Sequence, residues 1–464
     1  MGTFFDLEDW APMTRDSVLL AMAGIPPSEY IRLKATISTL RTNQHRVKYI
    51  LSQLRDERLL GEIDNLPVKS VAHCEIHRKH GTDALFDLGN PRRYDESIES
   101  YTKSIMYAPP NSKALAGAFA NRATALFKAG LYRECIADIN RALAIPQPPD
   151  SVARLFARKT RCYISLRDDI QDYQEEIQDA LDKAVNCLDD LPESEWELRQ
   201  LIIQMKNDPS TLCAPKYTFK KWDAEKMMPS IANESIQLNG VSSSVRVCYN
   251  ERYGRHLIAS RTIRVGEVIA VMKPYASYRL PEKLHSHCAY CLDQTWSSVP
   301  CNNCCQVMYC NEHCRQKAWE EYHEDECQPA ERLICQQMEF TTLFSMRLAI
   351  MAIKQSGGIP NLRKKIKTLD NWKNRRTRGF TAGVLENNYA NIYTSFEHCD
   401  KLTPDEMVQK ALLSSFILVS LGVETNLFHR KFTKLNQFYE DDNVTFIGGL
   451  IMKHFQILVT NMQS

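Results

Sequence analysis

The sequence lacks an excess of charge of either sign, since its 464 residues include 58 basic and 56 acidic side chains. This balance gives no general attraction to nucleic acid, so direct nucleic-acid binding is not expected. A secretory signal is also missing, because residues 1–20 carry Asp6, Glu8, Asp9 and Asp16 without a basic start or an apolar core. No run of eighteen apolar residues occurs. We therefore expect a soluble intracellular protein without a membrane segment, in which cysteines stay reduced.

Cysteine itself is plentiful, and eight of the sixteen cysteines fall between residues 288 and 327. Most of them, with one histidine, form four pairs separated by two or three residues, which is the spacing of zinc ligands. The paired residues are Cys288, Cys291, Cys301, Cys304, Cys310, Cys314, His323 and Cys327. Eight ligands are enough for two tetrahedral Zn²⁺ sites, with Cys305 left over. Spacing alone does not fix which pairs share an ion. A disulfide framework or ordinary buried cysteines explain the pairing less well.

Residues 71–210 read as helical and repetitive. One copy of the pattern starts near Tyr94 and a second near Tyr132, with a weaker third near Val152. The positions Tyr94, Ser97, Tyr101, Ser104 and Pro109 correspond to Tyr132, Cys135, Ile139, Ala142 and Pro146. Small residues suit close helix crossings, and the pattern predicts tetratricopeptide-like (TPR-like) repeats forming an α-solenoid, whose concave face usually binds a peptide or protein. An unrelated helical bundle is the alternative. Residues 27–62, within an N-terminal region 1–70, predict one or two amphipathic helices of unassigned role.

Short strands are predicted after residue 240, where apolar and polar residues alternate from Val245 to Tyr249. Further strands are expected at 257–259 and 268–271. The zinc segment follows, and then helices at 330–354, 405–423 and 447–459. These few strands need partners that the rest of the sequence does not offer.

A basic stretch at residues 363–378 follows Gly357, Gly358 and Pro360, which read as a linker. Seven further lysines and arginines accompany Arg363, against the single acid Asp370. Such a run is typical of a nuclear localisation signal, a phosphate-binding patch or a solvated loop, and the sequence leaves all three open.

The segment from Tyr253 to Leu257, continued by 266–269, resembles the opening strands of the SET domain of protein-lysine methyltransferases. The cysteine array resembles the MYND zinc finger, which is inserted after those strands in SET-and-MYND (SMYD) proteins. With repeats in front, residues 80–464 resemble the TPR-bearing fourth SMYD subfamily. The resemblance implies a multidomain α+β fold. Its parts are an N-terminal region 1–70, a TPR-like α-solenoid at 71–210, a split β-rich SET domain beginning at 240–281, an inserted MYND double-zinc finger at 288–327, and a helical SET insert with the start of the SET core at 330–464.

The resemblance also implies site residues. Two Zn²⁺ ions would be held by interleaved pairs, with Cys288 and Cys291 joining Cys310 and Cys314, and Cys301 and Cys304 joining His323 and Cys327. S-adenosylmethionine would be held by Tyr253, Gly254, Arg255, His398 and Asn461. A plain surface histidine remains an alternative for His398. Protein substrates, partner peptides and co-repressors are the implied partners, and the cytoplasm and nucleus the implied locations.

The chain departs from the family pattern near its end. The Asn-His-Ser-Cys stretch and the later Gly-Glu-Glu strand of SET catalysis do not occur, and the nearest match, Asn311 to Cys314, lies within the zinc segment. An apolar helical face continues from Ile447 to Leu458, so we expect a chain truncated within its SET domain, with the catalytic residues beyond its end. Two hypotheses follow. One is a protein-lysine N-methyltransferase active in its full-length form, and the other is a non-catalytic zinc-stabilised adaptor.

Overall fold

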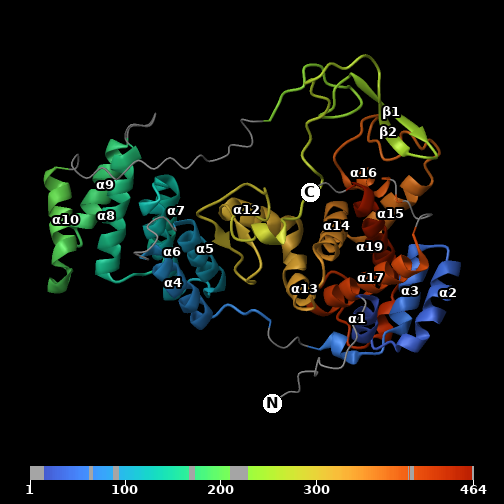
Figure 1. Ribbon diagram of the computed structural model, residues 1–464, viewed down its shortest axis with the longest axis horizontal. Helices are drawn as coiled ribbons and strands as arrows, with labels where there is room; N and C mark the ends of the chain where they lie inside the picture. The colour runs from blue at the N-terminus through green and yellow to red at the C-terminus, as the bar shows by residue number, and fades with distance from the viewer. Residues whose placement is uncertain are drawn as a thin grey trace. The chain divides into compact units, whose positions relative to one another are not determined.

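The computed structural model describes residues 15–61, 66–86, 94–166, 173–208, 228–395, 397 and 402–461. The chain forms two compact units. The repeat–finger unit comprises residues 67–224 and 279–318, and the helix–hairpin unit comprises residues 1–66, 225–278 and 319–464 (Figure 1).

Seven helices form the repeat part of the repeat–finger unit, among its described residues. They are α4 (Val71–Leu85), α5 (Tyr94–Tyr107), α6 (Lys113–Lys128), α7 (Tyr132–Leu143), α8 (Pro149–Leu166), α9 (Gln174–Val185) and α10 (Trp196–Asn207). Helices neighbouring in sequence pack together, most extensively α4 with α5, α6 with α7 and α8 with α9 (Figure 1). The predicted helices are therefore present, while the TPR interpretation stays a prediction.

Small residues explain the close helix crossings in this part. A Cβ atom on Gly81 of α4 would lie 2.7 Å from the ring of Tyr101 on α5, so only glycine fits there. Ser97, whose hydroxyl donates to the Gly81 carbonyl at 2.8 Å, is fully buried, as is Cys135. Gly130 takes a positive φ of 75° in the turn between α6 and α7. Most positions of the repeat pattern are thus buried between the helices, whereas Tyr94 and Pro109 are only partly buried and Pro146 is exposed.

The first part of the cysteine-rich segment packs on these repeats. It contains a two-stranded antiparallel sheet of β3 (Val299–Pro300) and β4 (Met308–Tyr309), followed by α12 (Glu312–Ala318). Met308, only 1% exposed, belongs to the same apolar core as the repeat helices. The guanidinium of Arg122 on α6 is completely buried and donates to the Ser298 carbonyl at 2.6 Å. Repeats and finger therefore share a core.

The helix–hairpin unit is mostly helical. Its helices begin with α1 (Arg15–Met22), α2 (Tyr30–Thr39) and α3 (Asn43–Gln53), and continue with α13 (Glu324–Cys335), α14 (Phe340–Ser356), α15 (Ile359–Asp370), α16 (Tyr389–Tyr393), α17 (Pro404–Glu424), α18 (Asn436–Glu440) and α19 (Asp442–Asn461). Short helical turns lie at η2 (Pro27–Glu29), η3 (Glu57–Leu60) and η7 (Trp319–His323), the last a π-helix. In the repeat–finger unit, similar turns are η4 (Glu193–Glu195) and η6 (Pro281–Lys283).

The N-terminal helices, whose role the sequence did not reveal, pack against α17 and α19. A Cβ on Gly448 of α19 would lie 2.6 Å from Cγ1 of Val47, and a Cβ on Gly449 would lie 2.9 Å from the backbone nitrogen of Gln44. Paired glycines thus let α3 approach α19 closely. Helix α17 is long and apolar enough to cross a membrane, but 72% of its most apolar stretch is buried within the structure, as in a core helix.

Only part of the predicted strand region forms strands. β1 (Val245–Asn250) and β2 (Gly254–Ala259) make an antiparallel hairpin in which Val247 faces Leu257. The third predicted strand, at 268–271, was wrong. This segment forms only an isolated bridge between Ala270 and Val241, with two backbone hydrogen bonds to residues 240–242. Within the described residues each sheet has two strands, so the predicted shortage of partner strands holds there.

Two further predictions need correction. The single helix expected at 330–354 is two helices, because Gln337 takes a positive φ of 56° between α13 and α14. The linker expected at residues 357–360 is a tight turn, in which Gly357 caps α14 in the left-handed conformation and Pro360 lies in the first turn of α15. Half of the basic stretch is therefore helical.

Candidate zinc centres and cofactor loop

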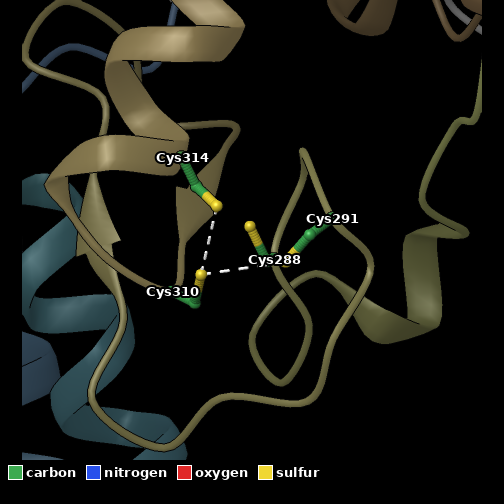
Figure 2. Close-up of side chains that lie close together, drawn as sticks. All are labelled: Cys288, Cys291, Cys310 and Cys314. Atoms are coloured by element: carbon green, nitrogen blue, oxygen red, sulfur yellow. Dashed lines mark hydrogen bonds between the residues drawn. The ribbon is translucent and has the colours of Figure 1, made fainter. Parts of the chain in front are cut away.

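The first ligand cluster consists of Cys288, Cys291, Cys310 and Cys314, whose sulfur atoms all lie within 4.8 Å of one another. Figure 2 shows the four side chains pointing toward a common centre, two from a loop, one from the end of β4 and one from α12. The Sγ atoms of Cys310 and Cys314 are 3.3 Å apart, and those of Cys291 and Cys310 are 3.7 Å apart.

Local backbone geometry produces this convergence. The loop that carries the first two cysteines is tight, since Leu292 takes a positive φ of 64° and the Tyr290 amide donates to the Cys288 sulfur at 3.4 Å. The side chain of Asn311 accepts a hydrogen bond from the Cys314 amide at 2.9 Å at the start of α12. Each pair of cysteines is therefore held by a turn of its own, as the spacing predicted.

The electrostatics of the first cluster call for a cation. Interaction with the thiol groups of Cys291 and Cys310 lowers the pKa of Cys288, and the same interaction raises the pKa values of those two thiols. Burial raises the pKa of Cys314 to about 12. Four thiolates are therefore not stable together without positive charge, which a bound Zn²⁺ would supply.

The second cluster brings together Cys301, Cys304, His323 and Cys327, all buried, with ligand atoms within 4.8 Å of one another. The Asn303 amide donates to the Cys301 sulfur at 3.4 Å, which repeats the turn geometry of the first cluster. These are the two groups of four that the family resemblance implied. Cys305 is buried but belongs to neither group. Both donor sets fit tetrahedral Zn²⁺, and with four protein ligands each leaves no open position for a catalytic water.

A buried ion pair supports the histidine of the second cluster. The Glu326 carboxylate lies 3.6 Å from Nδ1 of His323 and receives two hydrogen bonds from Arg347, at 2.8 and 3.0 Å. Burial alone would raise the pKa of the Glu326 carboxyl, but the guanidinium of Arg347 holds that pKa below its usual range, so Glu326 is ionised. A carboxylate next to a ligand histidine helps to orient its imidazole, and at 3.6 Å the contact here is an ion-pair distance rather than a hydrogen bond. Sequence spacing could not reveal this pair.

Residues 253–255, which we call the cofactor loop, span the end of the turn between β1 and β2 and the first two residues of β2. They are three of the residues assigned to the cofactor. Tyr253 is 55% exposed, and Gly254 takes a positive φ of 62°. The guanidinium of Arg255 donates to the Arg378 carbonyl at 2.5 Å and to Oδ1 of Asn391 at 2.6 Å. Burial, followed by the nearby Arg378 charge, lowers the pKa of Arg255. The structure therefore uses Arg255 to join the hairpin to the segment around α16.

The other two assigned residues lie farther along the chain. Asn461 is exposed in the last turn of α19, where its side-chain amide donates to the Ile457 carbonyl at 2.9 Å. His398 lies outside the described residues. The segment just before it is close to the loop, because Oγ1 of Thr394 accepts from Arg255 at 3.2 Å.

Comparison with known proteins places these features in a family. The MYND finger family matches residues 288–327. Protein-lysine N-methyltransferase SMYD4 of Mus musculus is 27% identical over 351 residues, which cover 69% of this chain and 41% of that protein. The Homo sapiens protein of the same name is 28% identical over the same shares. The chain is therefore similar to SMYD4 proteins over about two thirds of its own length, and it carries a MYND finger.

A more distant relative is histone-lysine N-methyltransferase ASHR1 of Arabidopsis thaliana, 26% identical over 186 residues, which cover 39% of this chain and 35% of that protein. No solved structure matches. The chain spans about two fifths of the length of the SMYD4 relatives it matches.

Proposed function

We propose that this chain is an SMYD protein that acts in S-adenosylmethionine-dependent methylation of lysines on histone or non-histone proteins. The similarity over 351 residues to proteins named protein-lysine N-methyltransferases carries the proposal. The repeats and the MYND finger would recruit substrates and partner peptides, including co-repressors. We propose the cytoplasm and nucleus as the places of action.

The two zinc ions would be structural in this scheme. Each four-ligand cluster supplies a closed tetrahedral site. Zinc would hold residues 288–327 in the conformation that presents both the finger and the neighbouring repeats to a partner. Metal-assisted chemistry is not part of the proposal.

For the cofactor, the proposal assigns contact to Tyr253 and Gly254. The positive φ of Gly254 and its missing side chain would let the backbone approach a bound molecule, and the exposed ring of Tyr253 would cover it. Arg255 would position this loop through its bonds to residues 378, 391 and 394. His398 and Asn461 complete the proposed set. When bound, S-adenosylmethionine supplies the sulfonium methyl group that a neutral lysine amine attacks.

The test is calorimetric titration of S-adenosylmethionine into the zinc-loaded chain, alone and as the variants Gly254→Ala and Gly266→Ala. Both glycines have positive φ, at 62° and 83°, so both variants carry similar backbone strain, on the order of 1 kcal/mol. We expect a loss of binding of about tenfold or more only for Gly254→Ala. Equal effects of the two variants would contradict the assigned loop, and no binding by the wild-type chain would end the enzymatic proposal for it.

A zinc-stabilised adaptor is the second candidate. The observation that favours it is the shared core of finger and repeats, which makes a rigid unit for partner binding without any cofactor. Binding of partner peptides, proline-rich ones among them, by a chain that fails to bind S-adenosylmethionine would select this function.

A further inference from the structure

A cavity of about 440 Å³ lies within the repeat–finger unit, between α5 and the segment that leads into the finger. One wall comes from the first turns of α5, and the other from residues 281–286 together with Trp296. Its lining is Asp95, Glu96, Ile98, Glu99, Pro281, Glu282, Leu284, His285, Ser286 and Trp296. The cavity is distinct from both cysteine clusters and from the cofactor loop.

The two walls are fixed to one another by buried contacts. Leu284 and Trp296 pack against the apolar core of the repeats. Two residues after Trp296, the Ser298 carbonyl accepts from the buried Arg122 at 2.6 Å, and the Ser297 carbonyl accepts from Arg141 at 2.5 Å. The cavity is therefore a preformed space between two modules rather than a gap between mobile parts.

The lining combines an apolar surface with negative charge. Ile98, Leu284 and the half-buried Trp296 supply the apolar side, while four carboxylates supply the charge. Glu99 pairs with Lys103 at 2.8 Å, whereas Asp95 and Glu282 are exposed and form no ion pair with any described residue.

The positive groups around the cavity do not cancel this charge. Burial lowers the pKa of His285 to about 4, so its imidazole is neutral at pH 7. Lys103 is already paired with Glu99, and Lys283 is exposed beside Glu282. Arg279, behind the wall, donates to the carbonyls of His287 and Gln306. Among the described side chains, negative charge therefore predominates in the lining of the cavity, which favours a cation.

We propose that this cavity binds an arginine side chain of a partner peptide. The aliphatic stem of arginine would lie on Ile98 and Leu284, its planar guanidinium would stack on Trp296, and its N–H groups would donate to the carboxylates of Asp95 and Glu282. Lysine offers a point charge without the planar fork and should bind more weakly. The proposal concerns peptide recruitment and holds whether or not the chain transfers methyl groups.

The test is fluorescence anisotropy of dye-labelled, capped peptides with the zinc-loaded chain at about 0.1 M salt. Four peptides share one sequence and carry arginine, lysine, citrulline or glutamate at a central position. Citrulline keeps the shape of arginine without its charge, and we expect it to bind about tenfold more weakly or worse. Glutamate should not bind.

Protein variants locate the binding. Glu282→Gln should weaken binding of the arginine peptide by about threefold, and Glu282→Gln with Asp95→Asn should weaken it by about tenfold. These losses are modest because both carboxylates are partly solvated. The matched control is Glu175→Gln, an exposed carboxylate on α9 of the same unit, which should change nothing. Circular dichroism and zinc content verify folding. Equal binding of arginine and citrulline peptides, or an equal loss with Glu175→Gln, would overturn the proposal.

Discussion

Arg122 is the residue whose removal should most disturb the repeat–finger unit. Its guanidinium has no exposed surface and donates to both oxygens of the equally buried Asp138, at 2.7 and 2.9 Å. It also donates to Thr102 on α5 at 3.0 Å and to the Ser298 carbonyl at 2.6 Å. One side chain therefore holds α5, α6, α7 and the finger together.

The loss of stability expected for Arg122→Ala follows from the buried polar groups that would be left without this arginine. Among the described residues, Asp138 would keep only Arg141, at 3.0 Å, as a charged partner, and the Ser298 carbonyl would lose its buried donor. Leaving a buried charge without its main partner costs about 3–5 kcal/mol. For a unit of this size, each kcal/mol shifts the melting temperature by about 2–4 °C, so a decrease of about 6–20 °C is expected.

The assay is thermal unfolding of the zinc-loaded chain followed by circular dichroism. The control is Arg154→Ala on α8, whose guanidinium is 48% exposed and pairs with Glu195, so it should cost less than about 1 kcal/mol. Replacing the pair by Arg122→Met with Asp138→Leu should recover much of the loss, because it removes both buried charges. If Arg122→Ala costs no more than Arg154→Ala, the buried network does not stabilise the unit.

Three further predictions concern the metal sites and the core. Cys304→Ala should lower bound zinc from about two ions per chain to about one, whereas Cys305→Ala should leave the zinc content unchanged, as measured by atomic absorption. Glu326→Gln should weaken zinc binding by about 10- to 100-fold in a chelator competition, while Glu324→Gln, an exposed control, should not. Burial lowers the pKa of His454 to about 3, so this imidazole is neutral in the folded state but takes up a proton below about pH 6.5 in the unfolded state. Stability should therefore fall as the pH drops from about 6.5 toward 3, by up to about 1.4 kcal/mol per pH unit, and His454→Gln should flatten that dependence in denaturant melts.

The sequence predicted the local features of the zinc segment well. A ligand pair such as Cys288 and Cys291 depends on one tight turn, and its spacing is visible in the chain. The positions of small residues such as Ser97 and Cys135 likewise located the helix crossings of the repeats. Both patterns are short in sequence, so local reasoning was enough to find them.

Contacts between distant segments left no such pattern. Arg122 and Ser298 are 176 residues apart, and nothing near either residue indicates the other. The packing of α3 on α19 depends on Gly448 and Gly449. Nothing in the sequence around these glycines indicates that α3 packs against them. The strand predicted at 268–271 failed for the same reason, since an apolar run becomes a strand only where a partner edge is available.

The shared core of finger and repeats would couple metal binding to the proposed peptide binding. Ligand residues must converge before Zn²⁺ binds, so the free energy of zinc binding contributes to the folding of the segment that carries them. That segment supplies Met308 to the repeat core and the Ser298 carbonyl to Arg122. Losing the first zinc ion would therefore loosen the wall of the acidic cavity that contains Trp296, although no cysteine touches the cavity. Zinc occupancy and peptide affinity should vary together, which a peptide site formed by the repeats alone would not require.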